Sequence, residues 1–179
     1  MRVETERLIL REYTITDLDV EHENNLDPEL FTYMPFNPPN TKEDTRKRII
    51  HMIEKQKKTP RTDYDVAITL KSNKKLIGGC RLNKVSDIQG HIGYKLAKEH
   101  WGKGYATEAA KALTDYGFTE LNLHRVYATV HPDNAASIRV LEKVGMIPEG
   151  RLREHILYRD GYRDSLIYSI LEQEWKPNR

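Results

Sequence analysis

The chain has 179 residues, 31% of them charged, and a formal net charge of +2 at pH 7. This length suffices for one sizeable hydrophobic core, so we expect a single domain over residues 1–179, and the small net charge gives no argument for direct nucleic-acid binding. The single cysteine, Cys80, excludes an internal disulfide framework and predicts a reducing, cytoplasmic setting, while the lack of any long apolar run excludes a membrane span.

The first third of the chain predicts one strand and two helices. The strand covers Arg7–Tyr13, and the helices cover Thr16–Leu26 and Thr41–Lys57. The second helix opens with a capping-box pattern, in which a threonine is followed three residues later by Asp44. The segment Glu29–Asn40 between the helices contains three prolines, so we expect an irregular connection there.

The middle of the chain predicts three strands. The first two, Val66–Leu70 and Lys75–Leu82, are separated by a short polar turn, and the third covers Gly90–Leu96. The third alternates as a half-buried strand should, with one face formed by Ile92, Tyr94 and Leu96. Cys80 lies in the second strand without an obvious partner base, so we interpret it as a buried structural thiol rather than an acyl-carrying nucleophile.

Two glycines, Gly102 and Gly104, lie where this third strand gives way to a helix that begins near Ala106. The first turn of a helix has backbone N–H groups without helical partners, and the helix dipole adds partial positive charge there. Glycines let the backbone approach an anion closely, so the loop predicts a phosphate-binding turn. The alternative is a turn that merely joins two elements, because the spacing matches neither the dinucleotide fingerprint nor the P-loop.

Another helix follows the predicted strand Arg125–Val130. Either Asp133 or Asn134 can cap its first turn, and Gly145 suits the left-handed position at its end. Asn134 and Ser137 are three residues apart, which places them on neighbouring parts of the first turn. Taken alone, Asn134 would be a cap and Ser137 an ordinary surface serine.

The C-terminal part of the chain predicts a hairpin. Its two strands, Arg151–Tyr158 and Ser165–Glu172, flank the sequence Arg159-Asp160-Gly161-Tyr162, which contains an Asp-Gly turn signal. The chain has no internal repeat and no low-complexity linker, and this agrees with the expectation of a single domain.

The glycine loop and the helix that begins near Asn134 together resemble the GNAT superfamily of acetyl-coenzyme A-dependent N-acetyltransferases. Within this superfamily the chain is most similar to the RimJ/RimL branch, which acetylates the N-termini of ribosomal proteins. The resemblance extends over nearly the whole chain, from Glu4–Arg11 through Leu76–Gly79 to Tyr162–Ser165. It implies an α+β GNAT fold, in which a central mixed, mostly antiparallel sheet splays in its middle and is flanked by helices.

The resemblance also implies acetyl-coenzyme A as cosubstrate and no metal. The loop that would hold the pyrophosphate begins at Trp101, where the superfamily pattern has a polar residue, a departure that the RimJ/RimL branch often shows. The Gly90–Leu96 backbone would pair with the pantetheine arm, Asn134 would contact the end of that arm, and Ser137 would lie near the thioester sulfur. The expected cofactor-binding residues are Tyr94, Lys95, Leu96, Trp101, Gly102, Lys103, Gly104, Tyr105, Ala106, Thr107, Asn134 and Ser137.

Ser137 and His91 are the catalytic residues that the resemblance implies. Many relatives carry a tyrosine four residues after the Ser137 position to protonate the departing thiolate, but this chain has Leu141 there, so Ser137 is the expected donor. His91 stands where relatives often have a glutamate, and its ordinary pKa of about 6.5 suits a general base that acts through water. The alternatives are an ordinary half-exposed strand histidine at this position and a second base candidate, His131.

The residues expected to bind the acceptor amine lie in loops. The resemblance implies that Phe31–Asn40 and the turn Tyr158–Tyr162 flank an acceptor cleft. Its expected lining residues, which equally suit core or turn packing, are Tyr33, Phe36, Tyr158 and Tyr162. An α-amino group has a pKa of about 7.7–8.0, against about 10.4 for a lysine side chain, so it demands less of a base. The weak base candidates therefore favour an α-amine acceptor.

Three functions fit the sequence. The first is direct transfer of acetyl, in a ternary complex, to the N-terminal α-amine of a protein such as a ribosomal protein. The second is acetylation of a small-molecule amine such as a polyamine or an antibiotic, because Asp115–Leu123 is similar to polyamine acetyltransferases. The third is a non-catalytic coenzyme A-binding module. Some relatives form homodimers, so the resemblance also allows a homodimer.

Overall fold

The computed structural model describes residues 1–39, 41–158 and 160–176. Its strands are β1 (Arg2–Glu4), β2 (Leu8–Glu12), β3 (Asp63–Leu70), β4 (Leu76–Lys84), β5 (Gln89–Leu96), β6 (Arg125–Val130), β7 (Ile147–Tyr158) and β8 (Gly161–Leu171). Its helices are α1 (Leu18–Asn24), α2 (Lys42–Gln56), α3 (Tyr105–Thr119) and α4 (Ala135–Val144), with 3₁₀ turns over Ile15–Asp17, Pro28–Phe31 and Lys98–His100. Asn40 and Arg159, which the sequence places in a connection and a turn, lie outside the described residues.

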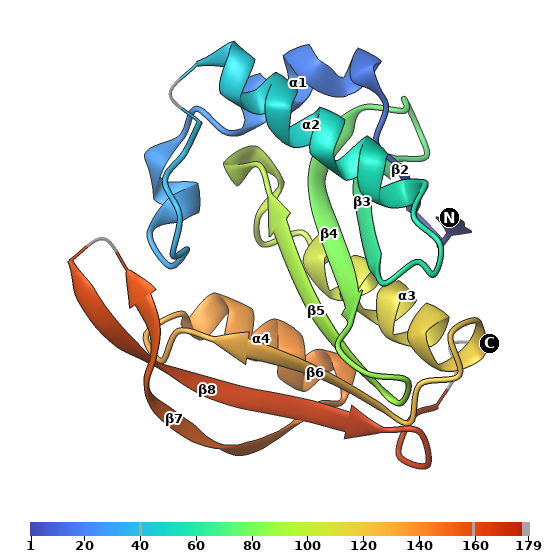
Figure 1. The fold of residues 1–179 in the computed structure, drawn as a ribbon, viewed down its shortest axis with the longest axis vertical. Coiled ribbons are helices and arrows are strands. Elements are labelled where there is room, and N and C mark those ends of the chain that lie inside the picture. Colours follow the sequence, from blue (N-terminus) through green and yellow to red (C-terminus); the bar gives the residue numbers. More distant parts are fainter. Residues whose placement is uncertain (40, 159, 177–179) are drawn as a thin grey trace.

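The strands form one sheet in the order β1-β2-β3-β4-β5-β6-β8-β7 (Figure 1). Neighbouring strands are antiparallel except β5 and β6, which are parallel. These two strands pair only over Gln89–His91 and Arg125–Tyr127 and then diverge, so the β5 edge from Ile92 to Leu96 has no β6 partner. The expected mixed, mostly antiparallel sheet that splays in its middle is therefore confirmed.

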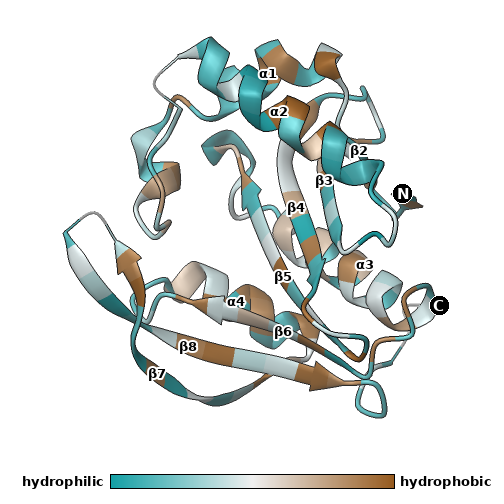
Figure 2. Cartoon of the chain, in the orientation of Figure 1, coloured by the Kyte–Doolittle hydropathy of each residue, from teal (hydrophilic) through white to brown (hydrophobic). Residues whose placement is uncertain are grey.

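Helices cover both faces of the sheet. Successive residues of a strand point to opposite faces, so a strand with apolar residues in succession needs a cover on each side. Val66 of β3 belongs to the main hydrophobic core together with Ala109 of α3. The next residue, Ala67, belongs to a smaller cluster packed against Met52 of α2, and Figure 2 shows both hydrophilic and hydrophobic residues on that helix. Cys80 also lies in the main core, and burial raises the pKa of its thiol well above the ordinary value, so its buried position is confirmed.

The first two helices follow the predictions with one difference. Thr41 caps α2 as expected, since its hydroxyl accepts a hydrogen bond from the Asp44 amide at 3.1 Å. The helix predicted over Thr16–Leu26 is a 3₁₀ turn continued by the shorter α1. The Asp17 carboxylate accepts a hydrogen bond from the Thr14 amide at 2.8 Å and draws the chain into that tighter first turn. None of the helices within the described ranges has the length and apolar character that a membrane crossing needs.

Strand boundaries differ more from the sequence prediction. The strand predicted from Arg151 begins at Ile147, because Ile147 and the following proline pair with β8. Strand β1 was not predicted, and β3 begins at Asp63 instead of Val66. Polar residues obscure the start of β3 in the sequence, whereas its pairing with β4 supplies the hydrogen bonds that extend it.

Candidate functional site

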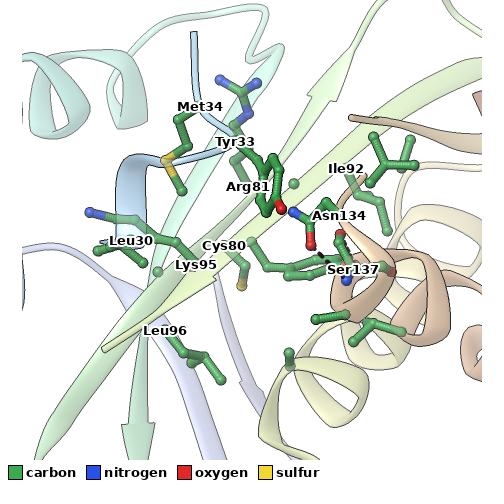
Figure 3. Close-up of a pocket in the computed structure, with 18 of the residues that line it drawn as sticks. Leu30, Tyr33, Met34, Cys80, Arg81, Ile92, Lys95, Leu96, Asn134 and Ser137 are labelled. Atoms are coloured by element: carbon green, nitrogen blue, oxygen red, sulfur yellow. Dashed lines mark hydrogen bonds between the residues drawn. The ribbon is translucent and has the colours of Figure 1, made fainter. Parts of the chain in front are cut away.

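The splay between β5 and β6 opens into a cavity of about 710 Å³. Residues from β5, β6, the glycine loop and α4 line one part of it, and the 3₁₀ segment that follows Pro28 lines another. Figure 3 shows Asn134 just before α4 and Ser137 in its first turn, together with Tyr33, Met34, Arg81 and Lys95 as lining side chains. The cavity therefore brings together segments that are far apart in the sequence.

The glycine loop has the backbone geometry that the phosphate prediction requires. Gly102 and Gly104 have φ angles of 72° and 82°, in the left-handed region that favours glycine. Gly104 is the N-cap of α3, so the loop leads directly into the amides of the first helical turn, which have no helical acceptors. The predicted loop residues from Trp101 to Thr107 line the cavity except Lys103, whose carbonyl instead accepts a hydrogen bond from Arg7 at 3.0 Å.

An ion pair between Arg7 and Glu108 holds this loop from outside the cavity. The Arg7 Nε atom donates to Glu108 Oε2 at 2.7 Å, and the Thr5 hydroxyl donates to Glu108 Oε1 at 2.6 Å. The Arg7 guanidinium also lies over the Tyr105 ring at 4.6 Å, and a Cβ atom added at Gly104 would meet its Nη2 atom at 3.3 Å. Sequence analysis missed this role, because nothing in a linear pattern shows that the Glu4–Arg11 segment reaches the loop.

Trp101 forms a hydrogen bond with the last residue of β5. Its indole Nε1 atom donates a hydrogen bond of 2.7 Å to the carbonyl of Leu96. A polar side chain at this position would lack both the indole donor and its flat apolar body. The predicted pairing of Leu96 with a pantetheine arm therefore has to share that carbonyl with Trp101, whereas the β5 edge before it is open.

Asn134 and Ser137 are held in place at the start of α4. The Asn134 Oδ1 atom accepts a hydrogen bond from the Ser137 amide at 3.0 Å, so Asn134 rather than Asp133 is the cap. The Ser137 hydroxyl lies 2.9 Å from the Tyr94 hydroxyl, which also donates to the Ser137 carbonyl at 3.2 Å. Burial raises the pKa of Tyr94 to about 12. Leu141, in the position of the tyrosine expected in many relatives, is buried in the core.

The two histidines that sequence analysis raised as bases have different surroundings. His91 lines the cavity with its Nε2 atom 3.3 Å from the Thr129 hydroxyl, and burial, reinforced by Arg81, lowers its pKa to about 4. His131 lies between the rings of Tyr33 and Tyr158, at centroid distances of 5.1 and 5.7 Å. The Nδ1 atom of His131 accepts a hydrogen bond from the Asp133 amide at 3.2 Å, so Nε2 carries the proton of the neutral ring. The Nδ1 lone pair of His131 is therefore engaged by the Asp133 amide.

Three of the four aromatic residues expected at the acceptor side line the cavity: Tyr33, Phe36 and Tyr158. The Tyr158 hydroxyl donates to the Tyr33 carbonyl at 2.9 Å and so joins the end of β7 to the segment after Pro28. The structure does not place Tyr162 in this cavity. Tyr162 is 61% exposed, because the hairpin turn directs it outward at the start of β8.

Lys95 carries a second interaction that the sequence did not indicate. Its ammonium donates to Glu21 at 2.7 Å and to the Asn25 amide oxygen, so β5 is joined to α1 beside the cavity. Burial lowers the pKa of Lys95, and the neighbouring Glu21 carboxylate opposes this change. The side chain therefore has a structural partner, while the predicted pantetheine contact concerns only the backbone.

The residues present fit coenzyme A. A helix N-terminus with two left-handed glycines suits a pyrophosphate, an unpaired strand edge suits an amide-containing arm, and a pair of hydroxyls suits a thioester end. Among the described residues, no group of three or more His, Cys, Asp and Glu side chains is arranged to hold a metal ion.

Comparisons with known proteins agree with this geometry. A family model for the acetyltransferase (GNAT) domain matches residues 7–147. The uncharacterized N-acetyltransferase p20 of Bacillus licheniformis is 36% identical over 173 residues, which is 96% of each chain. A GNAT-family acetyltransferase structure from Bacillus anthracis has a TM-score of 0.85 at 33% identity, covering 97% of this chain and 99% of that one.

A RimJ structure from Mycobacterium smegmatis, solved in complex with CoA-disulfide, has a TM-score of 0.82 at 26% identity. The alignment covers 93% of this chain and 83% of that one. The expected likeness to the RimJ/RimL branch is thus confirmed among solved structures. The chain belongs to the GNAT acetyltransferase family and is an N-acetyltransferase.

Proposed function

We propose that this enzyme transfers an acetyl group from acetyl-coenzyme A to the N-terminal α-amine of a protein, by direct attack of the amine in a ternary complex. The observation that carries this proposal is the shared cavity, in which the glycine loop, the open β5 edge and the Tyr94–Ser137 pair lie next to an acceptor end lined by Tyr33 and Phe36. Both reactants can therefore occupy one continuous space.

Different segments of the chain bind different parts of acetyl-coenzyme A. The amides from Gly102 to Thr107 face the pyrophosphate, because the first turn of α3 begins there with its partial positive charge. The β5 edge from Ile92 to Leu96 offers backbone groups to the pantetheine arm. Acetyl-coenzyme A supplies the acetyl group as a thioester, whose carbonyl carbon is open to attack by an amine.

Ser137, supported by Tyr94, protonates the departing thiolate. A lone serine hydroxyl is a weak acid, but the Tyr94 hydroxyl, 2.9 Å away, can turn its one proton from the Ser137 carbonyl to Oγ and replace the proton that the serine gives up. This pair takes the place of the tyrosine that many relatives have at the Leu141 position. When the new carbon–nitrogen bond forms and the carbon–sulfur bond breaks, the amine gives one proton to solvent water and the thiolate takes one from Ser137. The Tyr94–Ser137 pair then regains its proton from solvent.

His91 accepts a hydrogen bond from the amine, directly or through water, and is not a strong base. Its pKa of about 4 keeps the imidazole neutral in the neutral pH range and makes it a poor proton acceptor for an ammonium group. The acceptor must therefore arrive as a neutral amine. An α-amino group, with a pKa of about 7.7–8.0, meets this condition more readily than a lysine side chain does.

The test is thiol release from acetyl-coenzyme A across peptides with a free N-terminus, the same peptides with a blocked N-terminus, polyamines and aminoglycosides. We expect turnover with free N-terminal peptides that disappears when the α-amine is blocked. A blocked peptide that retains an internal lysine serves as the control for side-chain acetylation. Turnover confined to polyamines or aminoglycosides would reject the proposal.

A further inference from the structure

The acceptor end of the cavity has a floor made by one face of β3, β4 and β5. Strand pairing sets Asp65, Arg81 and Gly93 directly opposite one another in one row across this face. His91 lies on the same face of β5, two residues before Gly93. Because Gly93 has no side chain, Arg81 extends over β5, and a Cβ atom added at Gly93 would lie 3.3 Å from its Nε atom.

A second guanidinium reaches the same place from α2. Arg48 lines the cavity together with Arg81, and its guanidinium lies 5.4 Å from the centre of the Phe36 ring. Both arginines also line an adjoining hollow of about 330 Å³, together with the described residues Phe36 and Asn37. A helix and a strand thus direct two fixed positive charges to one part of the acceptor end.

Arg48 contacts the Phe36 ring and Arg81 lies near Asp65, but neither guanidinium has a salt-bridge partner in the described part of the chain. Across residues 1–39, 41–158 and 160–176, neither Arg48 nor Arg81 forms an ion pair or a side-chain hydrogen bond, whereas Arg7 and Arg11 are both paired with carboxylates. Among the described residues that line the same end, Asp65 is the carboxylate without a salt bridge, and burial raises its pKa. Two guanidiniums against one carboxylate leave an excess of positive charge.

Two other charged residues near this end, Lys95 and Glu29, are already paired, while Arg139 and Lys143 of α4 line the same cavity and add further positive charge. The ammonium of Lys95 is paired with Glu21, and the Glu29 carboxylate is paired with Lys98. A polyamine would therefore bring ammonium groups to a surface with excess positive charge. An arginine binds a carboxylate through two parallel hydrogen bonds, so an anionic group is the complementary occupant.

We propose that the acceptor carries a carboxylate close to its reacting α-amine, and that Arg81 and Arg48 bind it. The proposal rests on the proposed function, because it places the acceptor amine near His91 and Ser137. Neighbouring strands lie about 4.8 Å apart and an extended peptide rises about 3.4 Å per residue. The carboxylate therefore belongs within about three residues of the amine, as in a protein N-terminus with an acidic second or third residue.

The test compares kcat/KM for three peptides that begin Ala-Asp, Ala-Asn or Ala-Lys and are otherwise identical. We expect the acidic peptide to exceed the amide peptide by about tenfold or more, and the basic peptide to be the poorest. Arg81→Gln and Arg48→Gln should each lower kcat/KM for the Ala-Asp peptide more than for the Ala-Asn peptide, and so remove most of this preference. Arg81→Glu should reverse the order and favour the Ala-Lys peptide.

Arg46→Gln is the matched control, because Arg46 also lies on α2 but forms only an exposed ion pair with Glu43. Coenzyme A affinity by calorimetry should be the same in all variants, which shows that the cofactor end is intact. A free acidic amino acid and its amide form an additional pair. Arg81-dependent turnover of the free amino acid alone would support the anionic acceptor and assign its source to a small molecule.

Two results separate this inference from the proposed function. Equal turnover of the Ala-Asp and Ala-Asn peptides by the unmodified enzyme would overturn the inference and leave the α-amine function standing. Turnover of polyamines alone, unaffected by Arg81→Gln, would overturn both.

Discussion

The hydroxyl of Tyr94 on β5 lies 2.9 Å from the hydroxyl of Ser137 on α4. This contact crosses the splay of the sheet at the point where β5 and β6 have parted. Tyr94 was expected to contribute only backbone groups, yet its side chain supplies a phenol beside the serine. In the proposed function, this phenol on β5 takes the place of the tyrosine that many relatives have at the Leu141 position.

Removing the Tyr94 hydroxyl should slow turnover without weakening cofactor binding. We expect Tyr94→Phe to lower kcat about tenfold, since it removes a hydrogen bond that supports the proton donor, and Ser137→Ala to lower it about 100-fold. The double variant should be no slower than Ser137→Ala, because the two hydroxyls act as one unit. Single-turnover kinetics and calorimetry with coenzyme A are the measurements. Fully additive losses would show that the hydroxyls act independently.

Local signals predicted the parts of the site that are made from consecutive residues. The glycine turn at 102 and 104 follows from residue type, and so does a helix cap at Asp133 or Asn134, of which the structure selects Asn134. The Arg7–Glu108 ion pair and the Tyr94–Ser137 hydroxyl pair join residues that are distant in sequence. No periodicity shows such contacts, because they depend on how the sheet is ordered. The expected position of Tyr162 in the acceptor cleft also depends on tertiary structure, since the hairpin turn decides which side its ring faces.

Gly104→Ala should weaken coenzyme A binding. The substitution puts a side chain at a φ of 82° and sets its Cβ atom 3.3 Å from Arg7, so the loop must change shape at a cost of roughly 1–2 kcal/mol. We expect an increase of about tenfold in Kd by calorimetry. Gly150→Ala is the control, because nothing lies within 4 Å of the added methyl group there. An unchanged Kd for Gly104→Ala would remove the loop from phosphate binding.

Arg7→Ala should also weaken coenzyme A binding, although Arg7 does not line the cavity. Without Arg7, the Glu108 carboxylate remains as an uncompensated negative charge in the first turn of α3, beside the expected phosphate site. Adding Glu108→Gln should restore part of the lost affinity, since it removes that charge. Arg2→Ala, which breaks an exposed pair with Glu4, is the control. A double variant weaker than Arg7→Ala would show that shape, and not charge, governs the loop.

Lys95→Met should destabilise the fold more than a surface lysine change does. It leaves the Glu21 carboxylate buried without its cation, and removal of one partner of a buried pair costs about 3 kcal/mol. Lys98→Met is the control, because Lys98 forms only exposed ion pairs. Urea unfolding of both variants measures the difference. If Glu21→Gln restores stability in the Lys95→Met background, the buried charge is the cause, and if it does not, lost packing is.

The pH dependence of the rate should not report His91. Burial, reinforced by Arg81, lowers the pKa of His91 from 6.5 to about 4, so the ring is neutral in the folded enzyme above that pH. We expect kcat/KM to rise with the deprotonation of the acceptor amine, at about pH 7.7–8.0 for an α-amine. His91→Asn should lower the rate and leave the position of this limb unchanged. A rise of kcat/KM near pH 6.5 that disappears in His91→Asn would instead identify His91 as the general base.

The folded protein should also lose stability as pH falls from 6.5 toward 4, because only the unfolded chain takes up the His91 proton in this range. His91→Asn should reduce this loss of stability.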